Sequence, residues 1–168
     1  AYNAPDPGCD RIAGQLDKVR VLPDFSPEDF IPHRKPIRMI TALRRVGNND
    51  GDLECRIAED NVFLEADGTM DPAGFIEIGA QSLAYLDSFM REDKYLKGML
   101  VEVNRFHYTG RKVRSGDLLL VRSTHKYDFE PWHIAAFEIK DPDGNPISEG
   151  ELKVCQLDES MLSQFPQF

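Results

Sequence analysis

Glu77 and Gln81 stand one helical turn apart in the apolar stretch DPAGFIEIGAQSLAYLDSFM, residues 71–90. A carboxyl group in apolar surroundings has its pKa pushed upward, so it can act as a proton donor. A glutamine four residues further along a helix can hold that carboxyl in place. At the N-terminal end of the same helix, the N–H groups around Gly74 and Phe75 can polarise a carbonyl oxygen. These groups suit proton transfer beside a polarised carbonyl. The alternative is a carboxylate that only hydrogen-bonds the neighbouring backbone.

A base is needed to complete such chemistry, and the sequence has four histidines. His107 lies near the end of a predicted strand, where it can face a cleft, and we take it as the candidate catalytic partner of Glu77. His33 is interpreted as structural but stays a minority candidate for the base. His125 is interpreted as part of a solvated strand face, and His133 as a packing residue at a strand start. No cluster of His, Cys and Asp has metal-ligand spacing, so we expect no metal site.

Arg111, Lys112 and Arg114 form a basic loop in an otherwise acidic chain. They are either solvated turn residues or a docking point for a phosphate group or an acidic carrier protein.

Helical periodicity is clearest between Asp71 and Met90, where Asp71 and Pro72 give an N-cap followed by a first-turn proline. Apolar residues fill about half of that helix's circumference, which indicates a helix largely surrounded by protein. Ser26 caps a predicted single helical turn further upstream. The other segments have a strand pattern: 38–46, 52–58, 99–108, 117–127, 132–140 and 147–157. One helix cannot cover both faces of a six-stranded antiparallel sheet, so a sheet curled around the helix is expected, an α+β hot-dog fold.

The 168 residues carry a net charge of −9, which argues against nucleic-acid binding and against an anionic membrane surface. We divide the chain into an N-terminal arm, 1–25, and a single domain, 26–168. No apolar run is long enough to span a membrane, and no signal peptide is visible, although a removed leader stays open. The three cysteines have no metal or redox spacing and indicate a reducing cytoplasm.

Four short motifs occur in an order known from one family. Residues 31–36, IPHRKP, resemble the "(L/I)PHRxP" segment of the hot-dog 3-hydroxyacyl-[acyl-carrier-protein] dehydratases. Residues 75–81, FIEIGAQ, resemble their helix motif "LIEAxAQ", and 115–117, SGD, resemble their "PGD" turn. Residues 61–68, NVFLEADG, are similar to the "NxFLxADG" of dehydratase-like proteins found with aryl polyene clusters.

The chain departs from this family at one place. The dehydratases carry a catalytic histidine in a "GHFPGxPxMPG" loop before the helix, whereas residues 64–74 of this chain contain none. The resemblance implies a 3-hydroxyacyl-thioester dehydratase in which Glu77 keeps the place of the helix carboxylate. A hot-dog thioesterase, which also uses a helix carboxylate, is one alternative. A non-catalytic subunit that pairs with an active hot-dog dehydratase is the other, and the missing histidine favours it.

The resemblance also implies partners. The substrate is expected to be a thioester of acyl carrier protein or CoA, so that the phosphopantetheine belongs to the substrate and no further cofactor is expected. Hot-dog sheets usually pair, because a single sheet leaves an edge strand unsatisfied. We therefore expect a homodimer, or a heterodimer with a related hot-dog subunit, with residues 99–108 at the interface.

Overall fold

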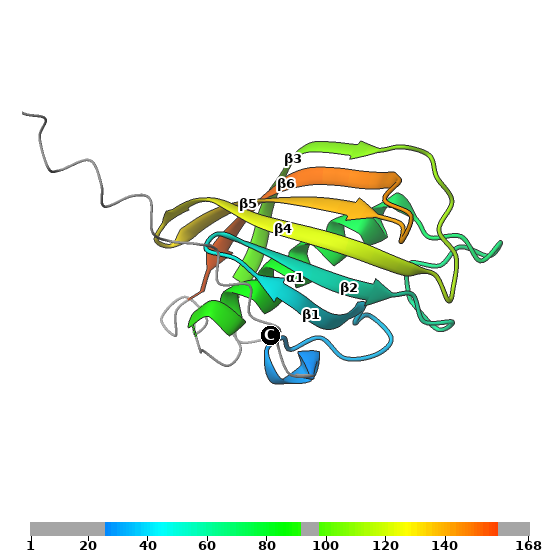
Figure 1. Cartoon of the computed structure of the whole chain (residues 1–168), viewed down its shortest axis with the longest axis horizontal. Helices are drawn as coiled ribbons and strands as arrows, with labels where there is room; N and C mark the ends of the chain where they lie inside the picture. Colours follow the sequence, from blue (N-terminus) through cyan, green and yellow to red (C-terminus); the bar gives the residue numbers. More distant parts are fainter. Residues whose placement is uncertain (1–25, 92–97, 158–168) are drawn as a thin grey trace, which may run out of the picture.

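Residues 26–91 and 98–157 are described by this computed structural model, and they form one long helix and a six-stranded sheet (Figure 1). The predicted arm, residues 1–25, lies outside the described residues. The elements are η1 (Pro27–Asp29), β1 (Ile40–Val46), β2 (Asp50–Arg56), α1 (Pro72–Arg91), β3 (Gly98–Tyr108), β4 (Leu118–Phe129), β5 (Trp132–Lys140) and β6 (Pro146–Gln156).

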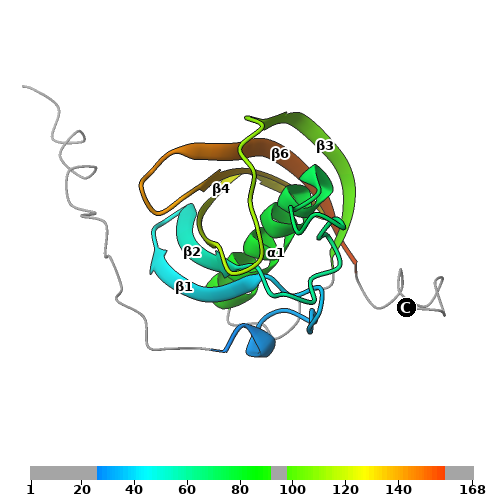
Figure 2. The same ribbon diagram turned by 90° about the vertical axis from the view of Figure 1, so that its right-hand side faces the viewer.

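The sheet is antiparallel, with the strand order β1-β2-β4-β5-β6-β3. After the β1–β2 hairpin the chain passes through α1 to β3 at the far edge of the sheet. It then returns to β4, which pairs with β2, and the β4-β5-β6 meander leads back to β3. Seen end-on, the sheet curls around α1 (Figure 2). This confirms the hot-dog architecture predicted from the sequence.

Most strand boundaries agree with the sequence pattern, and β5 spans the predicted residues. The first hairpin differs, because β2 already begins at Asp50 and the predicted turn at 47–51 shortens to 47–49. Arg45 of β1 forms ion pairs with Asp50 and Asp52, which keep these two residues in the ladder. The predicted side-chain cap by Ser26 is wrong: its carbonyl accepts from the Asp29 N–H, and its side chain makes no capping bond.

The helix is buried on more sides than an amphipathic pattern predicts. Phe75, Ile78, Tyr85 and Leu86 are fully buried, as the helical wheel indicates. Gln81 belongs with Glu77, Ala84 and Ser88 to a narrow polar strip opposite the apolar residues of the helix, yet it is also fully buried. A sheet that curls around a helix covers even its polar strip, so polar side chains there need partners inside the protein. No helix among the described residues is long and apolar enough to span a membrane.

Gly79 sets the distance between α1 and the sheet. A Cβ atom at this position would lie 2.6 Å from the ring of Phe137 on β5. A Cβ atom at Gly150, on β6, would lie 2.8 Å from the same ring. The Phe137 ring is therefore held between two glycines, and it has no free direction in which to move.

We expect Gly79→Val to lower the free energy of unfolding by about 1–3 kcal/mol, because the added carbons overlap the Phe137 ring. Met90→Val is the control: it places the same β-branched residue in the same helix, at a side chain that is 40% exposed. Denaturant melts of both variants measure the difference. Equal stability of the two variants would contradict the close packing at Gly79.

Candidate functional site

The Gln81 side chain joins the Glu77 carboxylate to the backbone that leads into β1. Its Nε2 donates to Glu77 Oε1 at 2.8 Å and to the Ile37 carbonyl at 2.9 Å. Its Oε1 accepts from the Met39 N–H at 2.9 Å. All three bonds come from an amide that is shielded from water, so neither its orientation nor that of the carboxylate is free to change.

His33 is the histidine that lies against Glu77. Its Nε2 is 3.4 Å from Glu77 Oε1, and the exposed fractions of the two side chains are 30% and 23%. His33 Nδ1 is buried and hydrogen-bonds no described atom. The pair therefore combines a titratable nitrogen and a carboxylate within reach of each other, both partly open to solvent. His33 is only a minority candidate from its sequence, and its position in IPHRKP, just before β1, is the signal that points to it.

His107 is not brought to Glu77. Phe106 and Tyr108, its neighbours on β3, pack against the core, while His107 is exposed. Because successive side chains of a strand point to opposite faces, His107 points away from α1. Its pairing with Glu77 stays a prediction that no contact among the described residues supports.

Two other histidines belong to a separate cluster. The interpretation of His125 as a solvated residue is wrong, since its side chain is 9% exposed and its Nε2 lies 3.5 Å from Asp87 of α1. Asp128 accepts from His133 Nδ1 at 2.7 Å and lies 3.7 Å from His125 Nδ1. Burial of Asp128 opposes its ionisation, but the His133 hydrogen bond and the nearby charges keep its pKa below the ordinary value. These groups link α1 to the β4–β5 hairpin at a distance from Glu77 along the helix.

The residues predicted to polarise a carbonyl are buried at the start of α1. Asp71 caps the helix, with Oδ1 accepting from the Ala73 N–H at 2.7 Å and its carbonyl accepting from the Gly74 N–H at 2.9 Å. Phe75 is fully buried, and its ring lies 5.1 Å from the ring of Tyr108. Gly74 and Phe75 thus form the closely packed, electropositive end of the helix that carries Glu77.

The basic loop is largely neutralised within the chain. Arg111 forms an ion pair with Asp141 at 2.6 Å, and Lys112 lies 3.5 Å from Asp67. The Arg114 guanidinium donates to the Asp67 carbonyl at 2.9 Å. The Lys112 side chain is 66% exposed, against 48% for Arg111.

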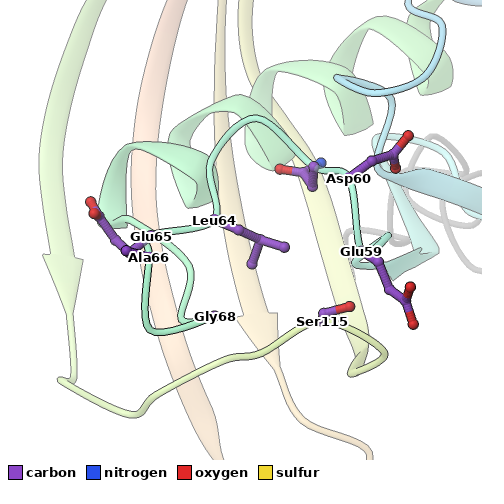
Figure 3. Close-up of a pocket in the computed structure, with 8 residues that line it drawn as sticks. Glu59, Asp60, Leu64, Glu65, Ala66, Gly68 and Ser115 are labelled. Carbon is purple, nitrogen blue, oxygen red and sulfur yellow. The ribbon is translucent and has the colours of Figure 1, made fainter.

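An open groove of about 660 Å³ lies between the 59–68 segment and Ser115 (Figure 3). Leu64 points into it, while Glu59 and Asp60 point outward. Glu65, a third carboxylate, also belongs to its lining. A surface with this charge repels phosphate, so the groove does not suit a phosphopantetheine arm. No group of His, Cys, Asp and Glu within residues 26–91 and 98–157 can hold a metal ion.

Comparison with known proteins identifies relatives of this chain. The sequence model of a family described as "ApeP-like: ApeP dehydratase" matches residues 25–167. Comparison with curated proteins gives no match.

Solved structures share the fold. The dehydratase heterocomplex ApeI:P from Xenorhabdus doucetiae is 20% identical over 86% of this chain and 99% of that chain, with a TM-score of 0.74. The PaaI protein of the E. coli phenylacetic acid degradation operon is 9% identical over 69% of this chain and 78% of its own, with a TM-score of 0.54. A hypothetical thioesterase with coenzyme A from Streptococcus pneumoniae is 11% identical over 68% of this chain and 84% of its own, with a TM-score of 0.53.

We expect Gln81→Glu to destabilise the protein by about 1–3 kcal/mol at neutral pH, because a buried carboxylate then faces the Ile37 carbonyl in place of an N–H donor. Burial beside this carbonyl raises the pKa of the new group, so its protonation restores stability as the pH falls. The stability difference from wild type should therefore shrink between about pH 7.5 and about pH 5. Denaturant melts at both pH values measure it. A difference that grows on acidification would contradict the bonding assigned to Gln81.

Proposed function

Because this chain belongs to the ApeP-like dehydratase family, we propose that Glu77 and His33 remove water from a 3-hydroxyacyl thioester. The observation that carries the proposal is the 3.4 Å contact between His33 Nε2 and Glu77 Oε1. The family's usual loop histidine is missing, and His33 supplies an imidazole beside the same helix carboxylate. A pair of this kind contains the base and the acid that elimination requires.

The proton steps balance within the pair. Neutral His33 takes the α-proton of the thioester through Nε2, and protonated Glu77 gives its proton to the 3-hydroxyl group. The C–O bond breaks, the enoyl thioester forms, and water leaves. His33 is then cationic and Glu77 anionic, and transfer of one proton between the two atoms restores the starting state. Elimination involves no net oxidation or reduction, so acid, base and a polarised carbonyl suffice.

Polarisation of the thioester carbonyl is assigned to the start of α1. The aligned peptide dipoles give this end, at Gly74 and Phe75, a partial positive charge. Negative charge develops on the thioester oxygen as the α-proton leaves, and a fixed dipole stabilises it without rearrangement. Gln81 keeps the Glu77 carboxyl in place while the charges change.

A second hot-dog subunit is proposed as the partner. β3 is an edge strand of the sheet, and four of its apolar side chains are at least 36% exposed: Met99, Leu100, Val101 and Val103. An exposed apolar edge favours pairing with another strand. The similar structure from Xenorhabdus doucetiae is a heterocomplex, which supports a related but different subunit as the partner.

The thioester carrier is proposed to be acyl carrier protein or CoA. Lys112, with a side chain that is 66% exposed, provides an accessible positive charge on the basic loop for an acidic carrier or a phosphate. A reducing compartment, such as the cytoplasm, is proposed from Cys55 and Cys155, which are both free and buried thiols.

Glu77→Gln and His33→Asn each test the acid–base pair. Each change keeps a similar shape but removes a transferable proton, so turnover should fall by about 10²–10⁴-fold. The assay follows formation of the enoyl thioester from a 3-hydroxyacyl pantetheine thioester, with the full chain and its associated subunit. Denaturant melts on the same preparations separate lost chemistry from lost folding.

Tyr127→Phe is the control for the assay, because this exposed residue of β4 belongs neither to the Glu77–His33 pair nor to the proposed β3 interface. Full turnover in both Glu77→Gln and His33→Asn would remove the assignment. Release of a free acid and a thiol in place of an enoyl thioester would identify a thioesterase. A wild-type chain that binds the thioester without turnover would identify a non-catalytic subunit.

We expect Val101→Lys combined with Val103→Lys to prevent assembly, because two charges cannot be buried unpaired at a strand edge. Light scattering should then give the mass of one chain. Tyr127→Lys is the control, since Tyr127 is an exposed aromatic residue on β4, away from β3, and its replacement should leave the assembly intact. A double variant that still assembles would contradict the interface at β3.

A further inference from the structure

Asn61 joins the loop before α1 to the segment that carries His33. Its Nδ2 donates to the Pro36 carbonyl at 3.1 Å, and its Oδ1 accepts from the Phe63 N–H at 3.0 Å. The residue is 4% exposed. Both the oxygen and the nitrogen of this buried side-chain amide are bonded to backbone. These bonds therefore fix the loop before α1 relative to the segment that contains Pro36.

The segment after His33 is therefore held by two buried amides. Asn61 binds the carbonyl of Pro36, and Gln81 binds the carbonyl of the next residue, Ile37. One amide comes from the loop before α1 and the other from α1 itself. Two consecutive carbonyls held from two elements leave the backbone little freedom to shift.

Among the described residues, none forms a hydrogen bond with His33 Nδ1, the ring nitrogen that does not face Glu77. A catalytic imidazole is commonly oriented by a hydrogen bond from the nitrogen that does not react. Here Nδ1 is buried and has no partner among the described residues, so no such bond fixes the ring. The position of Nε2 against Glu77 thus depends on the backbone that carries the ring. Arg34 supports this backbone on the other side, with its guanidinium bonded to the carbonyls of Ile31 and His33.

We infer that Asn61 is a positioning residue for His33: through the Pro36 carbonyl it keeps the imidazole within reach of the Glu77 carboxylate. This inference rests on the proposed function of the pair. Asn61 does not touch the substrate in this scheme, and its loss acts through the placement of His33.

The test is a double-mutant cycle between Asn61→Asp and His33→Asn. Asn61→Asp keeps the acceptor for the Phe63 N–H but replaces the donor to Pro36 with an oxygen. We expect kcat to fall by about 10–100-fold with little change in KM, since misplacement of a reacting group by about 1 Å costs about this much. In the His33→Asn background the same change should have almost no further effect, because the group it positions is already gone.

A second measurement does not depend on turnover. Diethyl pyrocarbonate modifies accessible neutral imidazoles, and peptide mass mapping gives a separate rate for each histidine. In Asn61→Asp the rate at His33 should rise severalfold, while the rate at exposed His107 stays constant and serves as an internal reference. Asn61→Ser, which is smaller and still polar, gives a second variant in case Asn61→Asp does not fold. Asn145→Ala is the matched control, because Asn145 also bonds through its side chain, to Asp141, in a turn remote from Glu77 along the chain.

The outcomes are distinct. An equal loss of turnover from Asn61→Asp with and without His33 would overturn the positioning role, and so would an unchanged modification rate at His33. Full turnover in His33→Asn alone would overturn the proposed function instead. The modification rate would then still decide whether Asn61 holds His33 in place.

Discussion

The site depends on one buried amide group, the side chain of Gln81. A sheet that curls around a single helix buries much of that helix, and Gln81 of α1 is fully buried although it is polar. An amide enclosed in this way must find partners inside the protein or cost the full penalty of desolvation. Gln81 finds three: a backbone donor, a backbone acceptor and the Glu77 carboxylate. The requirement that stabilises the fold thus also positions the carboxylate.

The same bonds explain why His33 lies where it does. Ile37 and Met39, which Gln81 holds, come directly after the IPHRKP segment, so the helix fixes the approach of that segment to β1. Glu77 lies one turn before Gln81 on the same side of α1. A side chain that extends from IPHRKP toward the helix therefore reaches the carboxylate. The contact between His33 and Glu77 follows from strand–helix packing, although the two residues are far apart in the sequence.

The sequence predicted the architecture because local patterns determine it. Helical periodicity at 71–90 and strand patterns elsewhere predicted the boundaries of the elements to within a few residues. With one helix and six strands, few arrangements can cover the sheet. The bond between Glu77 and Gln81 was also predictable, because both residues lie on one helix at a fixed spacing. Contacts within one element depend on its geometry alone.

The partner of Glu77 could not be predicted in this way. His33 is separated from Glu77 by β1 and β2, and His107 lies on β3, the strand that follows α1. The sequence does not say which of the two turns toward the helix. The burial of Phe106 and Tyr108 decides against His107, and the amide of Gln81 favours His33. His125 was misinterpreted for a related reason. Its neighbours on β4 are polar, so the sequence pattern assigns it to solvent, but α1 covers its side chain in the structure.

The location of both proposed catalytic groups in one chain bears on the role of a partner subunit. If the base and the acid came from different chains, each subunit would have to keep its own catalytic residue. A subunit that had lost this residue would then give an inactive pair. In this chain the 3.4 Å contact joins the two groups before any partner binds. In the proposed assembly the partner would need only a strand edge complementary to β3, which is a requirement of shape and polarity. A partner under this constraint can diverge in sequence while the proposed pair of Glu77 and His33 stays the same.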